Sequence, residues 1–424
     1  MKTYAKKHLS VFSSRVRFPL VTSFDLLGLG VVTYLLTLYL LTTESPTQAF
    51  SLNLAAASLI AWLFLAQFRS VATVLTRRSY RLLLAPSLAA LGTLSVQALT
   101  RSYYSGTALC CFVVAWTLWM LMVRLLYRRY VPPLRTLVIG APSFYAELRR
   151  LPQIVVTRLD TPPSTFSTFD VVILDPIRLY DDEWLQWLSH ADMTGLKIVA
   201  APLVLETLTC RVPLEMLHGR WAYAVFSGQS NYAPLKRVFD LAVVVLASPL
   251  LIPLGAAVAL AVYLDSGGPV FFWQKRVGKD GKPFMMVKFR SMRSDAEVNG
   301  AAFASLRDAR VTRTGAFLRK FRLDELPQFW NVLLGEMSVI GPRPEQQGFA
   351  KQFEGEIPLY SLRHNVLPGI TGWAQVMNGY AAGTDETLQK LRYDFYYVKH
   401  FSLELDVQVV VKTIGTMLTG FGSR

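Results

Sequence analysis

The sequence predicts an α-helical membrane region followed by α/β structure, and three observations support this fold class. Long apolar segments crowd the first 130 residues, short Val- and Ile-rich runs alternate with helical patterns after them, and a further apolar run precedes a strongly basic stretch. The chain has 424 residues, of which 52% are hydrophobic and 17% charged, with a net charge of +15. This composition excludes a disordered chain and disfavours an ordinary cytosolic enzyme. The positive charge favours anionic partners such as nucleic acid, lipid headgroups or phosphorylated substrates.

Four apolar segments within residues 1–130 are long enough to cross a bilayer, because a spanning helix needs about 20 apolar residues. They are Leu20–Leu41, Phe50–Phe68, Leu82–Leu99 and Ala108–Leu126. Lys and Arg side chains gather before the first segment, between the second and third, and after the fourth. Because positively charged loops stay in the cytoplasm, we expect both termini there. A cleavable signal peptide is disfavoured, since the first segment is too long and shows no small-residue cleavage site.

Residues 131–230 have the pattern of an α/β module. Strand patterns occur at Leu134–Gly140, Val171–Asp175 and Lys197–Ala201, with helical patterns at Ser143–Arg150 and Asp181–Met193. Alternation of strand and helix predicts a small parallel sheet. The run VIGAPS at 138–143 has one glycine after a strand and lacks the three-glycine dinucleotide fingerprint. A structural or regulatory role is therefore favoured over nucleotide binding.

The apolar run Leu241–Leu264 differs from the first four because prolines interrupt it. Ser248-Pro249 lies near its middle and Pro253 follows one turn later. An interior proline kinks or breaks a helix, and a neighbouring serine can bond the freed carbonyl. The basic segment that follows would translocate poorly. We expect a re-entrant helix over about residues 236–265 that enters and leaves one leaflet, with a proline-kinked fifth span as the alternative.

Thirteen Lys and Arg residues but only four acids lie between Lys275 and Arg322. No helix-turn-helix, zinc-finger or RNA-binding signature accompanies them, which argues against nucleic acid. Bases beside a membrane-embedded helix more naturally meet phosphates of lipids or nucleotides. Arginine is suited to this role because its planar fork can hold two phosphate oxygens.

Two adjacent carboxylates, Asp324 and Glu325, follow this basic segment. One could attack phosphorus while the other holds a divalent cation that offsets the charge of the substrate. Magnesium needs only one or two protein carboxylates when phosphates supply the other ligands. The alternative is a solvated helix start, where acidic side chains interact favourably with the positive end of the helix dipole. The stiff turn Gly341–Pro344 aims Arg343 from a rigid backbone.

Many ordered motifs from about residue 235 to 424 resemble one family. They are Lys236-Arg237 with Asp240, Ser248-Pro249, QKRVG at 274–278, KFRSM at 288–292, DARVTRTG at 308–315, RLDELPQ at 322–328, MSVIGPRP at 337–344, PGITGWAQ at 368–375 and YDFYYV at 393–398. This set is similar to the polyprenol-phosphate hexose-1-phosphate transferases, the bacterial sugar transferases that begin exopolysaccharide assembly. The pattern is closest to the undecaprenyl-phosphate glucose phosphotransferases.

The resemblance implies an architecture and an activity. Residues 231–424 would form a monotopic α/β catalytic domain with the re-entrant helix, behind four transmembrane helices and a Rossmann-like module. The implied reaction transfers a hexose-1-phosphate, expected to be glucose-1-phosphate, from a UDP-sugar to undecaprenyl phosphate with release of UMP. It would be the first membrane step of exopolysaccharide or capsule synthesis, on the cytoplasmic face of the bacterial inner membrane. The implied partners are these two substrates and the bilayer, without nucleic acid, and homo-oligomerisation is left open.

The resemblance also implies roles for individual residues. Asp324 would be the nucleophile that forms a covalent phosphosugar intermediate, and Glu325 the ligand of Mg²⁺. Residues expected to bind phosphate or substrate are Arg276, Lys288, Arg290, Arg322, Pro342 and Arg343. Arg237 would stand near the start of the re-entrant helix, with Ser248 and Pro249 at its break.

Some segments depart from the family pattern or leave alternatives open. Leu367 stands where a basic residue is usual, and the loop Val376–Ala382 is longer than usual and has no arginine. The segment Gly383–Leu391 favours the glucose branch over galactose. A non-catalytic scaffold, and a glycosyltransferase that moves only the sugar and releases UDP, are the competing classes. Phe401–Leu418 has the pattern of either an interfacial amphipathic helix or a core helix.

Overall fold

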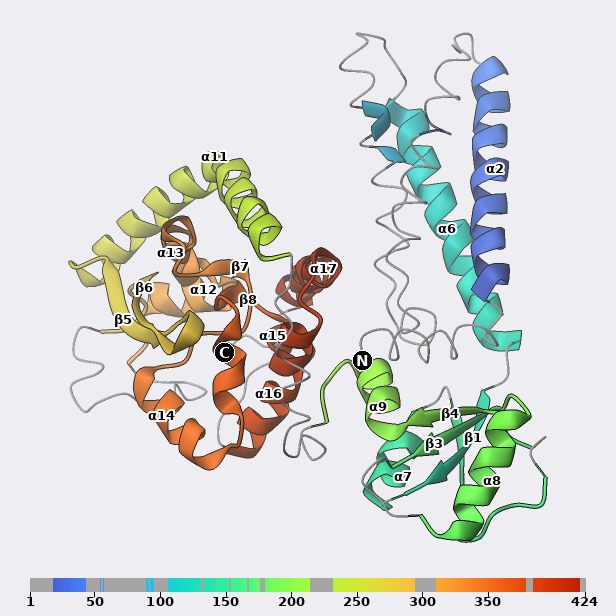
Figure 1. Ribbon diagram of the computed structural model, residues 1–424. Coiled ribbons are helices and arrows are strands. Elements are labelled where there is room, and N and C mark those ends of the chain that lie inside the picture. Colours follow the sequence, from blue (N-terminus) through green and yellow to red (C-terminus); the bar gives the residue numbers. More distant parts are fainter. Residues whose placement is uncertain are drawn as a thin grey trace. The chain divides into compact units, whose positions relative to one another are not determined.

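The computed structural model describes residues 18–42, 54, 56, 89–90, 92–94, 106–130, 133–140, 142–151, 154–165, 168–175, 180–213, 232–293, 310–378 and 384–419. The chain divides into two compact units, residues 1–209 and 210–424 (Figure 1). The segment directly after Thr209 bonds to the second unit, and the expected domain boundary at 230 stays a prediction. Trp373 Nε1 donates to Cys210 O (2.9 Å), and Val212 N donates to Arg392 O (3.0 Å).

Two long apolar helices in the first unit match the first and fourth predicted segments. They are α2 (Phe18–Thr42) and α6 (Gly106–Tyr130). They pack against each other, with the Trp119 indole donating to Phe24 O (2.9 Å) and that of Trp116 to Asp25 O (3.3 Å). The predicted segments 50–68 and 82–99 lie outside the described residues, apart from isolated positions.

Two helices within the described part of the chain are long and apolar enough to span a membrane. They are α6, over Gly106–Val123, and α11 (Ala233–Ser266) in the second unit. The apolar part of α2, Phe24–Leu36, is shorter. The four spanning helices therefore stay a prediction, and the structure shows the first and fourth predicted segments as helices α2 and α6.

A four-stranded parallel sheet follows in the first unit, in the order β2-β1-β3-β4. The strands are β1 (Leu134–Ile139), β2 (Ile154–Arg158), β3 (Val171–Leu174) and β4 (Lys197–Ala200). The helices are α7 (Pro142–Arg149), α8 (Asp182–Met193) and α9 (Ala201–Thr209). The predicted parallel α/β module is thus confirmed, and the Asp181 carboxylate caps α8 by accepting from Trp184 N (2.9 Å).

Helices cover both faces of this sheet, which explains why its strands are continuous Val and Ile runs. Leu148 of α7 and Leu205 of α9 pack in one cluster with Val138. Trp187 of α8 packs in another with Leu137. The strand β2 and the helix α9 were not expected from the sequence. The edge strand β2 ends in Thr-Arg and is half-buried, so its apolar signal is short.

The second unit places its elements around a core of aromatic side chains that includes Tyr360, Trp373, Phe395 and Tyr397. Its elements after α11 are β5 (Phe271–Val277), η2 (Lys279–Gly281), β6 (Pro283–Phe289), α12 (Arg313–Phe321), η3 (Leu323–Glu325), α13 (Gln328–Leu334), β7 (Ser338–Ile340), α14 (Gln347–Glu356), η4 (Tyr360–Asn365), β8 (Gly369–Thr371), α15 (Trp373–Asn378), α16 (Thr384–Lys399) and α17 (Leu403–Thr419). The strands β5 and β6 form an antiparallel hairpin, and β7 pairs with β8 in parallel.

Helix α11 is continuous and bent near its middle (Figure 1). The missing N–H of Pro249 would have bonded Val245 O, and the Ser248 hydroxyl donates to that carbonyl instead (2.8 Å). The expected kink and its serine partner are therefore present, but the helix is not interrupted. Both limbs pack on the second unit, through Val244 in one cluster and Val258 in another.

A buried ionic cluster fixes the start of α11 to the rest of the second unit. Lys236 Nζ lies 2.8 Å from Asp240 Oδ1 and 3.1 Å from Asp406 Oδ2, and all three side chains are at most 4% exposed. The Tyr397 hydroxyl donates to Asp406 Oδ1 (2.7 Å), and Val339 N donates to Asp240 Oδ1 (3.2 Å). The N-terminal half of α17, which holds Asp406, is therefore a core helix.

Candidate active site

The predicted carboxylate pair lies in η3, a single tight turn between α12 and α13. The turn begins at Arg322, whose backbone is left-handed (φ 56°). Asp324 and Glu325 are both buried, each with 8% of its surface exposed. A solvated helix start would leave them in water, so this alternative from the sequence does not apply.

Two cations converge on Glu325. Arg343 lies with its guanidinium 2.6 Å from Glu325 Oε1, and Lys288 Nζ lies 3.8 Å from the same oxygen. Burial disfavours the charged form of Glu325, yet Arg343 and Lys288 hold its pKa at about 2. Burial, together with the nearby Arg343 charge, lowers the pKa of Lys288 to about 8. Glu325 is therefore ionised at neutral pH, whereas Lys288 loses its charge just above neutral pH.

Asp324 is the more basic carboxylate of the pair. Burial and the Glu325 charge raise its pKa, against the opposing charges of Lys288, Arg319 and Arg343. Environments that push two adjacent carboxyl pKa values apart are a mark of functional sites. A desolvated carboxylate beside three cations is suited to approach a phosphorylated substrate.

Arg319 was not singled out from the sequence. Its Nε donates to Ser291 Oγ (3.0 Å), which fixes the guanidinium on the side of Asp324. The close approach of α12 to the segment after β6 requires Gly315, because a Cβ there would lie 2.0 Å from Ser291 O. The glycine in DARVTRTG was the available signal, since only a residue without a side chain permits such contact.

The loop that carries Arg343 is built against the PGITG motif. A Cβ at Gly369 would lie 2.0 Å from Gly341 N, and one at Gly372 would lie 2.1 Å from Gly341 O. Gly341 N donates to Thr371 O (2.9 Å), and Gly369 N donates to Pro342 O (2.9 Å). The two glycine motifs are therefore one structural unit that fixes Pro342 and the residue after it.

Two arginines donate hydrogen bonds to backbone carbonyls of this loop: the buried Arg363 to Arg343 O and the half-buried Arg276 to Pro344 O. Arg363 donates to Arg343 O (3.0 Å) and also binds Asp394 Oδ2 (2.8 Å). Arg276, expected to contact phosphate, donates to Pro344 O (3.1 Å) and to Gln274 Oε1 (3.0 Å). The structure thus uses Arg276 to support the loop. Arg363 was missed by the sequence analysis, because a buried cation has no pattern of its own.

The other predicted residues are placed as follows. Arg290 follows β6, is 8% exposed and makes no side-chain hydrogen bond or ion pair with the described residues. The charge of Arg322 acts on Glu325 from the turn itself. Arg237 donates to the carbonyls of Val332 and Leu333 and so caps the end of α13. Arg237 and Ser248 therefore have structural partners within the second unit.

The carboxylate pair has free capacity for a cation. Glu325 Oε2 and both Asp324 oxygens have no hydrogen-bond or ion-pair partner in the described part of the chain. No group of three or more His, Cys, Asp or Glu side chains lies together among those residues. One or two carboxylates suit Mg²⁺ when phosphates and water complete its ligands. The donor set fits that ion and does not form a closed protein cage.

Comparisons with known proteins point to one family. Residues 231–420 match the family described as bacterial sugar transferase. The chain is 44% identical over 334 residues to the UDP-N-acetylgalactosamine-undecaprenyl-phosphate N-acetylgalactosaminephosphotransferase of Aeromonas hydrophila, covering 78% of this chain and 75% of the relative.

Two further relatives match less than half of this chain. The UDP-glucose:undecaprenyl-phosphate glucose-1-phosphate transferase of Escherichia coli (strain K12) is 45% identical over 184 residues, covering 42% of this chain and 39% of the relative. The exopolysaccharide production protein PSS of Rhizobium leguminosarum bv. phaseoli is 43% identical over 192 residues, covering 44% of this chain and 96% of the relative. With the Aeromonas relative aligned over three quarters of its length, the chain belongs to the bacterial sugar transferase family and is an enzyme of the phosphoglycosyl transferase class.

Proposed function

We propose that this enzyme transfers a hexose-1-phosphate from a UDP-sugar to undecaprenyl phosphate and releases UMP. The observation that carries the proposal is the buried Asp324–Glu325 pair, whose two carboxyl groups differ in pKa and face Arg343, Lys288 and Arg319. A phosphoryl group with several negative oxygens needs such cations at its transition state.

In the first step, an Asp324 oxygen attacks the phosphorus that bears the sugar. A bond forms between that oxygen and phosphorus, and the bond between this phosphorus and the bridging oxygen of the diphosphate breaks. The electron pair leaves with UMP, and the phosphosugar remains joined to Asp324 through an acyl-phosphate bond. The raised pKa of Asp324 supports this role, because a desolvated carboxylate is a stronger nucleophile than a hydrated one.

In the second step, a phosphate oxygen of undecaprenyl phosphate attacks the same phosphorus. The bond to Asp324 breaks, the carboxylate is regenerated, and the sugar diphosphate lipid leaves. Arg343 and Lys288 stand beside the carboxylate pair in both steps and offset the charge of the phosphates. Dividing the transfer into two displacements lets one carboxylate serve both substrates.

Mg²⁺ would be held by Glu325, whose Oε2 is available and whose low pKa keeps it ionised. When bound, the ion supplies Lewis-acid stabilisation of the phosphate oxygens. Glu325 also orients Arg343 through their 2.6 Å contact.

The relatives are named for different donor sugars. The Aeromonas relative is named for N-acetylgalactosamine and the Escherichia coli relative for glucose, and the two are 44% and 45% identical to this chain over their aligned regions. The segment Gly383–Leu391 favoured glucose from the sequence, with galactose as the alternative. Purified enzyme with undecaprenyl phosphate and each of the three UDP-sugars identifies the donor by the rate of UMP release.

We further propose that α11 enters and leaves the cytoplasmic leaflet, with the second unit on the cytoplasmic face. The bend at Pro249 supports this topology, as does the packing of both limbs on the second unit. Several side chains on the outer side of α11 are exposed and apolar: Leu246, Leu250, Leu260 and Leu264. A tag after Arg424 that is accessible only from the periplasm would overturn this topology.

The leaving nucleotide separates the proposal from its competitors. A phosphoglycosyl transferase releases UMP, whereas an enzyme that moves only the sugar releases UDP. A scaffold without activity releases neither and takes no label from a radioactive UDP-sugar. Chromatography of the nucleotide products of the purified protein therefore tests all three.

A further inference from the structure

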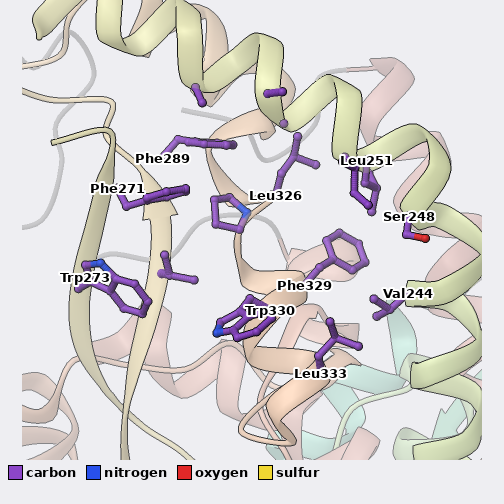
Figure 2. A pocket seen from close by; sticks show the side chains of 16 residues that line it. Val244, Ser248, Leu251, Phe271, Trp273, Phe289, Leu326, Phe329, Trp330 and Leu333 are labelled. Carbon is purple, nitrogen blue, oxygen red and sulfur yellow. The ribbon is translucent and has the colours of Figure 1, made fainter. Parts of the chain in front are cut away.

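A large apolar cavity, shown in Figure 2, is lined in part by Leu326, which directly follows Glu325. It lies between the inner side of the bent helix α11, the hairpin β5–β6 and the start of α13, and its volume is about 660 Å³. Small residues on α11, Gly255 and Ala256, leave the space that Phe289 and Leu326 border from the other side. The side chains on this part of α11 are therefore too small to fill the space opposite the hairpin.

This cavity is open on one side, since Ile252, Trp273 and Trp330 of its lining are 70%, 50% and 55% exposed. Its volume falls within the ~300–1,000 Å³ of ligand pockets. The Ser248 hydroxyl, at its edge, is engaged with the backbone of its own helix. The remaining lining is aliphatic and aromatic apart from the two indole N–H groups, so the part of a ligand that fits here is hydrocarbon.

The inner end of the cavity adjoins the charged site. Leu326 lines the cavity and directly follows Glu325. Side chains alternate along a strand, so on β6 Val287 and Phe289 face the cavity, whereas Lys288, which reaches Glu325, points to the opposite face. Arg290, two residues further on, is a buried cation without a side-chain partner in the described part of the chain. A ligand that fits both places has an anionic head and a hydrocarbon chain.

The outer end of the cavity is bordered by tryptophans. Trp273 and Trp330 line it and are 50% and 55% exposed, and both indoles are seen on the side away from α11 in Figure 2. Tryptophans with one apolar and one wet side are typical of membrane–water interfaces. The cavity thus connects an interface-like rim to the carboxylate pair.

We propose that this cavity holds the first isoprene units of the polyprenyl chain of the lipid acceptor, whose phosphate lies beyond Leu326 at the carboxylate pair. The inference rests on the proposed function for the identity of the acceptor. The remainder of the chain leaves along α11, past the exposed Ile252, into the leaflet that this helix occupies. Hydrocarbon burial then positions the attacking phosphate, and the charged groups act on it.

Two adjacent alanines provide a matched test. Both are exposed residues of α11, but Ala256 lines the cavity and Ala257 does not. Ala256→Leu fills the space of part of an isoprene unit, and we expect the KM for undecaprenyl phosphate to rise about tenfold or more. The KM for the UDP-sugar and the first-step release of UMP stay unchanged. Ala257→Leu adds the same apolar volume and leaves all values at those of the wild type. Equal acceptor KM values for the two variants would overturn the proposal.

A direct binding measurement separates this proposal from the proposed function. Farnesyl phosphate bearing a terminal benzophenone is photo-crosslinked to the full-length protein in nanodiscs, and the labelled peptides are identified. We expect label on residues that line the cavity in the wild type and in Ala257→Leu, reduced in Ala256→Leu, and removed by undecaprenyl phosphate. Equal removal by phosphatidylglycerol would identify an ordinary acyl chain as the occupant, and label outside the cavity would refute the site. Specific label in a protein that transfers no sugar would refute the proposed function and retain the binding site.

Discussion

Arg363 offers a test of how the loop carrying Arg343 is held in place. Its guanidinium is 3% exposed and lies 2.8 Å from Asp394 Oδ2 and 3.0 Å from Arg343 O. Arg363 does not contact the carboxylate pair, so it acts as a positioning residue. Removing it affects both the fold and the loop, and the two effects must be separated.

Arg363→Met alone leaves Asp394, which is 1% exposed, without its cation. Removing one partner of a buried pair costs about 3–5 kcal/mol, whereas replacing both by apolar residues is often neutral. We therefore expect Arg363→Met to lower the melting temperature strongly, and Arg363→Met/Asp394→Leu to recover most of it. The double variant still lacks the donor to Arg343 O.

A hydrogen bond from a charged donor contributes about 1.5–3 kcal/mol. If that contribution aligns Arg343 for the transition state, its loss lowers kcat about 10- to 100-fold. UMP release and thermal unfolding are measured on the same preparations of the wild type and both variants. A double variant with wild-type melting and wild-type kcat would refute the positioning role, because the loop would then hold Arg343 without Arg363.

Three further predictions follow from the site. The pKa of Lys288 is lowered to about 8, so its charge is present below that pH and lost above it. UMP release is therefore expected to fall above pH ~8. In Lys288→Arg this fall should move to higher pH, because arginine titrates above 12. A fall at the same pH in the variant would show that another group causes it. Gly369→Ala forces a Cβ against Gly341 N, so we expect a lower melting temperature and loss of activity. Gly348→Ala is the control: a Cβ there meets nothing within 4 Å, and both melting temperature and activity should stay at wild-type values. EDTA is expected to abolish UMP release and Mg²⁺ to restore it, and full activity in EDTA would exclude the metal role of Glu325.

The parts of the fold that could be predicted are those with strong local patterns. Alternating Val-rich runs and helical patterns predicted the parallel sheet, and Asp181 marked the start of α8. The edge strand β2 was missed because its apolar signal spans only three residues, Ile154–Val156. The sequence predicted that Pro249 would kink or break α11, and the helix continues through a bend because the Ser248 hydroxyl donates to the carbonyl that Pro249 leaves without a donor.

In the candidate site, too, residues within motifs could be predicted, whereas contacts that depend on packing could not. The motifs identified Asp324, Glu325, Lys288 and Arg343, and the structure brings these four together. A sequence cannot show which of many arginines faces which group, because that depends on contacts between distant segments. Arg276 supports the loop through Pro344 O, and Arg319 approaches Asp324.

The central claim is that Asp324 forms a covalent bond to the sugar-bearing phosphorus. The most direct test incubates the wild type and Asp324→Asn with UDP-sugar and Mg²⁺ in the absence of the lipid acceptor, followed by intact-protein mass spectrometry and assay of the released nucleotide. We predict a hexose-phosphate adduct on Asp324 and one equivalent of UMP for the wild type, and neither for Asp324→Asn. Full UMP release by Asp324→Asn, or release of UDP by the wild type, would contradict it.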